Sequence, residues 1–213
     1  MVEMMLRFAI VTLAAGTLVG ASSQDPTKSL PDAYKTELDN DYVTVVRVHY
    51  DAGAKLAEHT HSGGTTVYVY LNDSEGVVFK HFGDNTRAVT RPPVKTGGIR
   101  ISTGPEEHHT AENTSSMPSD FLRIWLKTDR ATARNVRRIP PGESEFSNAQ
   151  LRVTRIKLEQ HDTQTIAAKE PALVIELPSG NTQWIAAGTS AEIANHEVPV
   201  LDLVRIDFLT KPQ

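Results

Sequence analysis

The chain has 213 residues, enough for one ordinary domain or two small ones with a substantial buried core. Charged residues make up 23% and the formal net charge is −4, so the overall charge gives no support to a nucleic-acid partner. The sequence has no cysteine, which excludes disulfides, thiolate metal ligands and cysteine nucleophiles. Any metal must therefore be bound by nitrogen and oxygen atoms.

Residues 1–23 have the pattern of a secretory signal. Arg7 precedes the weakly polar stretch FAIVTLAAGTLVGA, which suits a signal-peptide core and is short for a bilayer span. Two pairs of residues suit a cleavage point, either Val19 and Ala21 or Ala21 and Ser23. The alternatives are a short membrane anchor and a buried N-terminal helix. We predict a signal peptide, a secreted or periplasmic protein, and no stable membrane insertion after cleavage.

A polar segment, residues 24–41, is expected as an N-terminal extension. Beyond it, β-branched and polar residues alternate in residues 42–50, 65–71 and 76–82, and further strand-like sequence covers 97–103 and 120–128. Turn-forming sequences such as DAGAK and NDSEG separate these segments. Short strands at close spacing, without a helical period, predict an all-β sandwich or barrel over residues 42–128.

The composition changes between residues 129 and 150. Pro140, Pro141 and Gly142 lie in this segment, after a cluster of four arginines: Arg130, Arg134, Arg137 and Arg138. A nucleic-acid patch is one interpretation, but the acidic total charge favours a solvated connection. We therefore predict a linker over residues 129–150 between two β units.

Strand-like sequence resumes over residues 151–213, in an order that resembles the first unit. RVTRIKL matches TVVRVHY, ALVIELPSG matches TVYVYLNDSEG, and NHEVPVLDLVRIDF matches NTSSMPSDFLRIWL. The sequence therefore predicts an internal repeat with a shorter second copy. Two unequal copies in one chain would form an internal pseudo-dimer, as a monomer in solution or within a homodimer.

Two pairs of histidines lie in the first unit. His59 and His61 are one residue apart, so on a strand both imidazoles point to the same face. His108 and His109 are neighbours, so at most one of them can join that pair on an extended segment. Three histidines with open coordination positions suit a divalent transition metal, either iron, zinc, manganese, nickel or copper. The second copy lacks these histidines.

The same residues resemble the cupin superfamily. Gly53-x5-His59-x-His61, followed by TTVYVYL, is similar to the first cupin motif, and His109-x3-Asn113 is similar to the end of the second. The resemblance implies a double-stranded β-helix, the cupin jelly-roll barrel, over residues 42–128 and a smaller, degenerate cupin-like β domain over 151–213. It also implies that His59, His61 and His109 bind the metal, and that the protein acts on a small organic substrate as a dioxygenase or isomerase.

The sequence departs from the family pattern at one ligand. The motif glutamate is expected at Thr65 or Thr66, and neither is acidic. Three interpretations stay open: the histidines alone hold the metal, another acid replaces the missing one, or the barrel has lost its metal and is a non-catalytic binding or structural protein. Four acids are candidate replacements: Glu58, Glu106, Glu107 and Glu112.

Other side chains are assigned from the strand pattern. On the last strand of the first unit we predict an aliphatic core face, with Arg123 and Trp125 directed toward a partner sheet or interface. Three residues are predicted to line a substrate pocket: Thr65, Tyr68 and Tyr70. Four are predicted at the surface: Lys80, His81, His161 and His196. The sequence has no phosphate-binding loop and no G-x-S-x-G or H-E-x-x-H motif, so nucleotide hydrolysis and serine hydrolase chemistry have no support.

Overall fold

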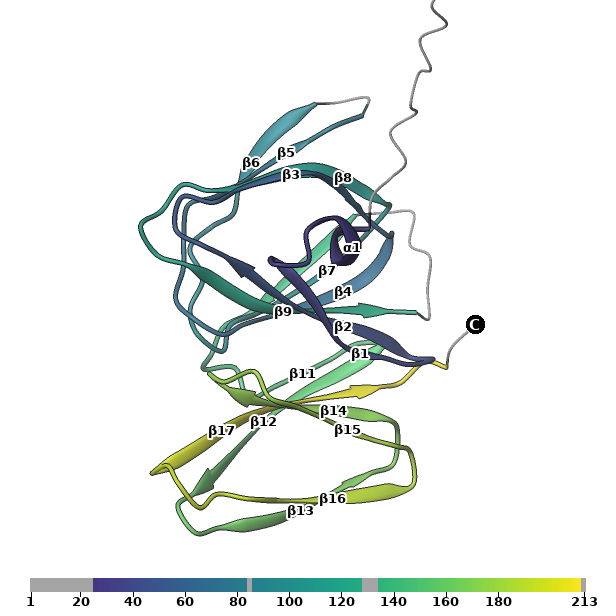
Figure 1. The fold of residues 1–213 in the computed structure, drawn as a ribbon. Coiled ribbons are helices and arrows are strands. Elements are labelled where there is room, and N and C mark those ends of the chain that lie inside the picture. Colours follow the sequence, from purple (N-terminus) through teal and green to yellow (C-terminus); the bar gives the residue numbers. More distant parts are fainter. Residues whose placement is uncertain (1–24, 84–85, 128–133, 212–213) are drawn as a thin grey trace, which may run out of the picture.

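The computed structural model describes residues 25–83, 86–127 and 134–211, and these are almost entirely β (Figure 1). The predicted signal peptide, residues 1–23, lies outside the described residues. One short helix, α1 (Pro26–Ser29), precedes the strands β1 to β17. Within the described ranges, no helix is long and apolar enough to cross a membrane. The prediction of an all-β fold is confirmed.

The N-terminal half is a barrel of two antiparallel sheets. The larger has the order β1-β2-β9-β4-β7-β10 and contains β1 (Tyr34–Asp39), β2 (Val43–Tyr50), β4 (Gly64–Tyr70), β7 (Ile99–Gly104), β9 (Ser119–Leu126) and β10 (Asn135–Ile139). The smaller has the order β3-β8-β5-β6 and contains β3 (Lys55–His61), β5 (Val77–His81), β6 (Arg87–Thr90) and β8 (Glu107–Asn113). Because the chain passes repeatedly between the two sheets, they close as a jelly roll.

The C-terminal half repeats this plan in reduced form. Its larger sheet has the order β11-β12-β17-β14-β15 and contains β11 (Glu145–Ser147), β12 (Leu151–Glu159), β14 (Ala172–Leu177), β15 (Thr182–Ile185) and β17 (Val200–Phe208). Its second sheet is the pair β13 (Thr163–Ala168) and β16 (Thr189–Ala194). The central order β12-β17-β14 matches β2-β9-β4, so the predicted smaller second unit is confirmed.

Two segments predicted to lie outside the barrels belong to the sheets. The predicted linker, residues 129–150, contains β10, which pairs with β7, and β11, which pairs with β12. The predicted extension, residues 24–41, contains β1, which pairs with β2 and buries Tyr34. These strands lie at sheet edges, where sequences are short and polar because one side is unpaired. Because these strands carry many charged residues, the hydrophobic pattern of the sequence did not predict them.

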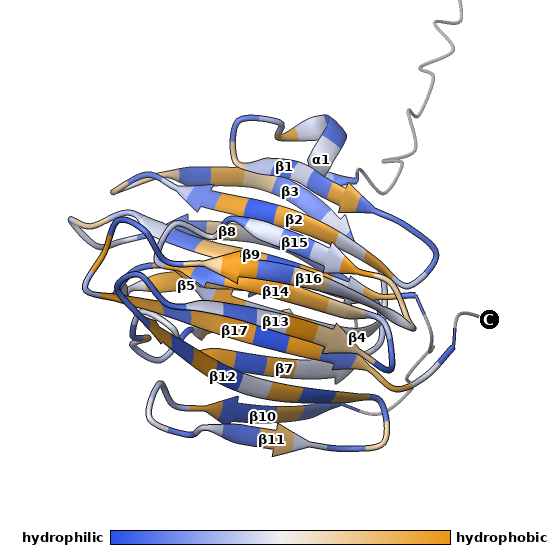
Figure 2. Ribbon diagram, turned by 90° about the horizontal axis from the view of Figure 1, so that it is seen from below, coloured by the Kyte–Doolittle hydropathy of each residue, from blue (hydrophilic) through white to orange (hydrophobic). Residues whose placement is uncertain are grey.

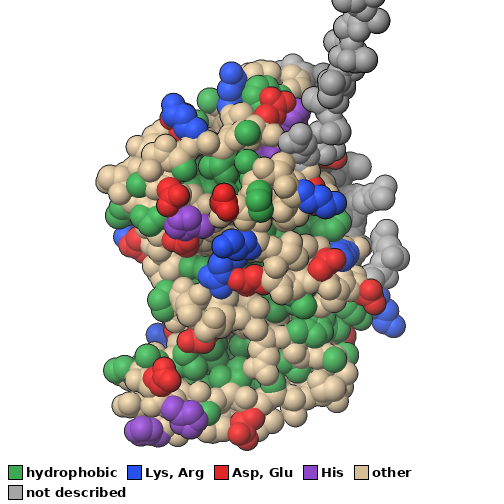
Figure 3. All heavy atoms as spheres, in the orientation of Figure 1, with side chains coloured by type: hydrophobic (Ala, Val, Ile, Leu, Met, Phe, Trp, Pro, Cys, Tyr) green, Lys and Arg blue, Asp and Glu red, His purple; other side chains and the backbone are tan. Residues whose placement is uncertain are grey.

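The arginines of residues 129–150 do not form one basic patch. Arg134 and Arg137 each make an ion pair with a glutamate at 2.7 Å, and Arg138 lines a cavity described below. Arg130 lies outside the described residues. On the face shown in Figure 3, basic and acidic side chains are interspersed.

The four sheets form four layers, with the two large sheets in the middle (Figure 1). The aliphatic side chains between these two sheets form the largest buried cluster in the described part of the chain: Val43, Val45, Val67, Val69, Leu122, Ile124, Val153, Leu173, Ile175, Val204 and Ile206 among others. In the view from below, where the C-terminal half lies in front, apolar and polar residues alternate along strands such as β12 and β17 (Figure 2). One face of each large sheet is thus buried against the other half, and its opposite face lines its own barrel.

This layering corrects the interpretation of β9. The aliphatic residues Leu122 and Ile124 face the other half of the chain, whereas Phe121 and Arg123 face the interior of the N-terminal barrel. Strand β9 is buried on both faces, so the alternation alone could not tell which face looks inward.

Matching polar contacts join the two halves. Arg47 on β2 donates to the carbonyl oxygen of Gly180 at 2.8 Å, and Arg155 on β12 donates to that of Gly97. Both glycines have positive φ, 74° at Gly97 and 72° at Gly180. A Cβ at either position would lie within 3.0 Å of a leucine of the opposite half. The two halves therefore pack with approximate twofold symmetry, and glycine is required at both equivalent turns.

A buried asparagine closes each half in the same way. Asn113 Nδ2 donates to the carbonyl oxygen of Tyr50 at 3.3 Å, at the end of β2. Asn195 Nδ2 donates to the carbonyl oxygen of Leu158 at 2.9 Å, near the end of β12. Each amide also donates, at 2.8 Å, to a carbonyl a few residues further along its own chain segment.

The central cluster predicts that the two halves unfold together. We expect Leu122→Ala to lower the free energy of unfolding by about 2 to 5 kcal/mol, because Leu122 is fully buried between the two sheets. The fluorescence of Trp125 and Trp184, one in each half, should report a single transition in urea. Val136→Ala, at an exposed position, is the control and should change the free energy by less than about 0.5 kcal/mol. Two separate transitions would contradict a shared core.

His49 predicts a pH dependence of stability. Its Nδ1 lies 2.5 Å from Asp120 Oδ1 and its Nε2 lies 3.0 Å from Asp51 Oδ1, and these carboxylates, chiefly Asp120, raise the pKa of His49. The stabilisation should be complete below about pH 6.5, the ordinary pKa, and lost as pH rises through the higher pKa of the folded state. The difference between the urea midpoints of the wild type and His49→Gln should therefore shrink as the pH rises above about 6.5. A difference that does not change with pH would contradict this.

Candidate metal centre

Three histidines converge inside the N-terminal barrel, on the face that β3 and β8 turn inward. The antiparallel register places His59 opposite His109 and His61 opposite Glu107. Because alternate residues on a strand share a face, all four side chains project from the same side of this sheet. His108 lies on the other side, where its Nε2 is 2.7 Å from Glu58 Oε1.

The three histidines are close enough to share one ion. One ring nitrogen from each of His59, His61 and His109 lies within 4.8 Å of the others. Their ring centroids are 4.8 to 5.2 Å apart. Their exposed fractions are 1%, 8% and 3%, so the cluster is shielded from bulk water.

Two tyrosines position His59. Its Nδ1 lies 2.8 Å from the carbonyl oxygen of Ala57, and since a carbonyl only accepts, this nitrogen carries the proton. The Nε2 therefore carries a lone pair directed into the barrel, and this lone pair accepts a hydrogen bond from the Tyr34 hydroxyl at 2.9 Å. Tyr34 and Tyr50 share a hydrogen bond of 2.6 Å. Burial raises the pKa of Tyr50 to about 12, so this hydroxyl stays protonated at neutral pH.

His109 is buried without a hydrogen bond. Both of its ring nitrogens lack a partner among the described residues, which is costly for a polar group shielded from water. Burial lowers the pKa of His109 to about 3, with further contributions from His59 and His81, and burial also lowers the pKa values of His59 and His61. All three imidazoles are therefore neutral at neutral pH, the form that binds a metal. An ion shared by the three would satisfy one of the two unpaired nitrogens of His109, so these residues fit a divalent transition metal.

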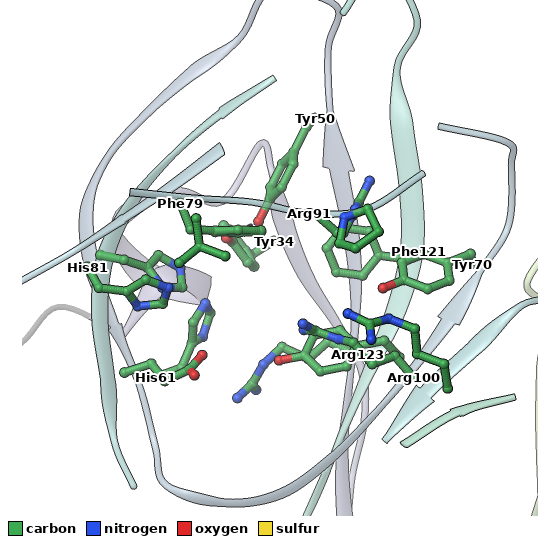
Figure 4. Close-up of a pocket in the computed structure, with 16 residues that line it drawn as sticks. Tyr34, Tyr50, His61, Tyr70, Phe79, His81, Arg91, Arg100, Phe121 and Arg123 are labelled. Carbon is green, nitrogen blue, oxygen red and sulfur yellow. Dashed lines mark hydrogen bonds between the residues drawn. The ribbon is translucent and has the colours of Figure 1, made fainter. Parts of the chain in front are cut away.

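A cavity of about 110 Å³ opens beside this cluster (Figure 4). His61 and His81 lie on one side of it, and three arginines, Arg91, Arg100 and Arg123, lie on the other. Aromatic rings complete the lining: Tyr34, Tyr50, Tyr68, Tyr70, Phe79 and Phe121. A small molecule in this cavity would contact the histidines and the arginines together.

Of the three predicted pocket residues, Tyr68 and Tyr70 line the cavity and Thr65 does not. Thr65 is fully buried on the opposite face of β4, and its hydroxyl lies 3.0 Å from both Thr103 Oγ1 and Gln150 Oε1. Residues on β4 alternate, so a single face cannot hold both Thr65 and Tyr68. Thr66 is on the inner face, in a recess that also contains His61.

The four candidate replacements for the missing carboxylate have different surroundings. Glu58 pairs with His108, Glu112 pairs with Lys55 at 3.1 Å, and Glu106 is exposed. Glu107 alone of the four lines the cavity, opposite His61 on the paired strand. Its carboxylate already makes an ion pair with Arg134 at 2.7 Å.

Sequence reasoning missed a fourth histidine at the site. His81 was predicted to be an exposed hairpin residue, but it is half-buried, lines the cavity and lies opposite His109 on β8. The two ring centroids are 5.2 Å apart. The alternation in VVFKH could have identified His81, because it places Phe79 and His81 on one face. Lys80 is exposed, as are His161 and His196.

The C-terminal barrel has apolar residues at the equivalent positions. Counting back from the equivalent asparagines, His109 lies four residues before Asn113, and Ala191 lies four before Asn195. Ala191 is paired with Ile166 across β16 and β13, as His109 is with His59. Ile166, Ala168 and Ala191 thus take the places of the three histidines, and they belong to the apolar core of the second barrel.

No family model matches this sequence, and no curated protein matches it. Solved structures do match. AerE from Microcystis aeruginosa is 11% identical, with 83% of this chain and 97% of that chain covered and a TM-score of 0.56. A quercetin 2,3-dioxygenase from Acinetobacter baumannii is 11% identical, with 84% and 73% covered and a TM-score of 0.50. A cupin domain from Bordetella pertussis is 21% identical over 44% of this chain and 90% of that one, with a TM-score of 0.36.

Identities this low establish the fold and nothing further. The fold is a pair of jelly-roll barrels, one of which carries an inward-facing histidine cluster. The chain therefore has the jelly-roll fold that its resemblance to cupins predicted, with two barrels in one polypeptide.

Proposed function

We propose that this protein is a metal-dependent cupin enzyme that acts on a small organic substrate, as a dioxygenase or an isomerase. His59, His61 and His109 would hold a divalent transition metal, either iron, zinc, manganese, nickel or copper. The observation that carries the proposal is the buried His109, whose two ring nitrogens have no partner among the described residues although two other neutral imidazoles converge on the same point.

A metal held there would supply Lewis-acid chemistry, polarising an oxygen atom of the substrate. The rest of the reaction environment comes from the chain. The backbone carbonyl of Ala57 fixes the orientation and tautomer of His59 through its Nδ1. The aromatic lining excludes water, and the arginines opposite the histidines orient a ligand between the two groups. Glu107 and His81, both on the cavity wall, are the titratable groups available to accept or donate a substrate proton.

We also propose that residues 1–23 direct export, on the strength of Arg7 and the apolar stretch that follows it. The large apolar faces of the two halves cover each other within one chain, which favours a monomer in solution.

Metal binding tests the proposal directly. Metal-stripped protein reconstituted separately with each of the five metals should retain about one ion per chain for at least one of them. His59→Ala, His61→Ala and His109→Ala should each weaken binding by about a hundredfold or more, because each removes one ligand. The measurement is metal analysis after equilibrium dialysis.

His161→Ala, at an exposed histidine in the other half, is the matched control and should bind like the wild type. Wild-type protein that retains none of the five metals, or retention that is unchanged in all three ligand variants, would refute the proposal. The non-catalytic binding or structural cupin would then be the better description.

Tyr34→Phe tests whether the Tyr34 hydroxyl competes with the ion for His59 Nε2. Because the hydrogen bond from Tyr34 must break before this nitrogen binds a metal, its removal should tighten metal binding by about two- to tenfold. Competition with a metal indicator measures this. Tyr42→Phe, whose ring packs near Trp184 away from the site, is the control. Weaker binding by Tyr34→Phe would show instead that the hydroxyl stabilises the bound ion.

A further inference from the structure

Cationic side chains form a row across the inner face of the large N-terminal sheet. Arg123 on β9 lies opposite Tyr68 on β4, Tyr68 lies opposite Arg100 on β7, and Arg100 lies opposite Arg138 on β10. All four residues line the cavity beside the histidines, and Arg91 joins them from the segment after β6. The sheet register therefore gathers three guanidinium groups at one site, and Arg91 adds a fourth.

These cations have almost no acidic partner. The one carboxylate on the cavity wall belongs to Glu107, and it is paired with Arg134 outside the row. Arg91 donates to the hydroxyls of Ser74 and Ser119 at 2.9 and 2.8 Å, and both of these partners are neutral. The Arg100 guanidinium lies 4.0 Å from the centroid of the Tyr68 ring, and its Nε has no hydrogen-bond partner among the described residues.

Among these arginines, Arg123 is the one whose burial without a partner is clearest. It is 9% exposed, its Nε has no hydrogen-bond partner, and no ion pair is formed by it within residues 25–83, 86–127 and 134–211. Its side chain projects into the cavity, toward the side that carries His61 (Figure 4). Arginine is rarely buried without a partner, because loss of its hydration must be offset by an opposite charge or by hydrogen bonds. A ligand that brings negative charge would supply that partner.

The volume and the lining of the cavity limit which ligands it can bind. Its volume of about 110 Å³ is below the roughly 150 Å³ of a cavity that holds one benzene molecule, so the ligand is small. The rings of Tyr70, Phe79 and Phe121 give it flat apolar walls, which suit an organic skeleton better than an inorganic oxyanion. Guanidinium groups bind carboxylates through paired hydrogen bonds in one plane.

We propose that the cavity binds a small organic carboxylate, whose carboxylate group is held by Arg123 and Arg100 while the remainder of the molecule faces the histidines. This rests on the proposed function for its role as substrate, but the binding itself depends on the arginines. The arginine row is therefore a substrate-binding device that selects anions of a few carbon atoms and rejects their neutral analogues.

Calorimetric titration with malonate tests this in both zinc-loaded and metal-stripped protein. Malonamide, which has the same skeleton without charge, should bind at least about tenfold more weakly. Arg123→Gln and Arg100→Gln should each weaken malonate binding by about ten- to a hundredfold, since each removes a charge-assisted hydrogen bond. Arg137→Gln is the matched control. It alters the same sheet next to Arg138, but its side chain pairs with Glu143 away from the cavity, and it should bind malonate like the wild type.

Circular dichroism and the urea midpoint of each variant show whether it folds. If Arg123→Gln does not fold, Arg100→Gln serves as the test. Malonamide binding as tightly as malonate, or malonate binding unchanged in the folded arginine variants, would overturn the inference. Inorganic phosphate binding more tightly than malonate would overturn the assignment to a carboxylate. Arginine-dependent malonate binding by metal-stripped protein would support the inference even if reconstitution showed that no metal is retained.

Discussion

The mutual burial of the two large sheets is the constraint on which the rest of the structure depends. Each presents an aliphatic face to the other, with residues such as Leu122 and Leu173 fully buried between them. Apolar burial on this scale dominates folding free energy, and here it is shared by both halves of the chain. Each half covers the aliphatic face of the other's central strands, so each depends on the other to bury it. The equivalent arginine contacts of Arg47 and Arg155 add a defined relative orientation to this apolar contact.

This arrangement frees the barrel interior for polar chemistry. The outer face of the N-terminal sheet contributes a large apolar core. The free energy gained there offsets the desolvation of Arg100, Arg123 and several tyrosines on the inner face. The histidines come from the small sheet opposite, so the site lies between two sheets whose spacing is fixed by the surrounding β ladders. In the C-terminal barrel the positions equivalent to the three histidines are held by Ile166, Ala168 and Ala191. Only one copy of the repeat thus carries an inward-facing histidine cluster in the described part of the chain.

The sequence predicted those features that depend on local pattern. Alternation identified the central strands of both halves, and His59, His61 and His109 were placed together because their spacing fits a strand and a motif. Features that depend on long-range register were missed. Strand β10 looked like a linker because its arginines are charged, and its structure comes from pairing with β7. Arg123 was expected to face a partner sheet or interface and instead lines the cavity of its own barrel, because a strand buried on both sides gives no sign of which side encloses a cavity.

The paired asparagines have a consequence for how such repeats diverge. Asn113 and Asn195 make equivalent bonds to the main chain, although only the first lies in a barrel with histidines. Within the His-x3-Asn motif, the asparagine is therefore an architectural element, separable from the chemistry of the histidine four residues earlier. Selection on a duplicated barrel can abandon the histidine while still retaining the amide. A remnant asparagine between two strand-like segments is accordingly a useful marker for finding chemically silent copies of this barrel in other sequences.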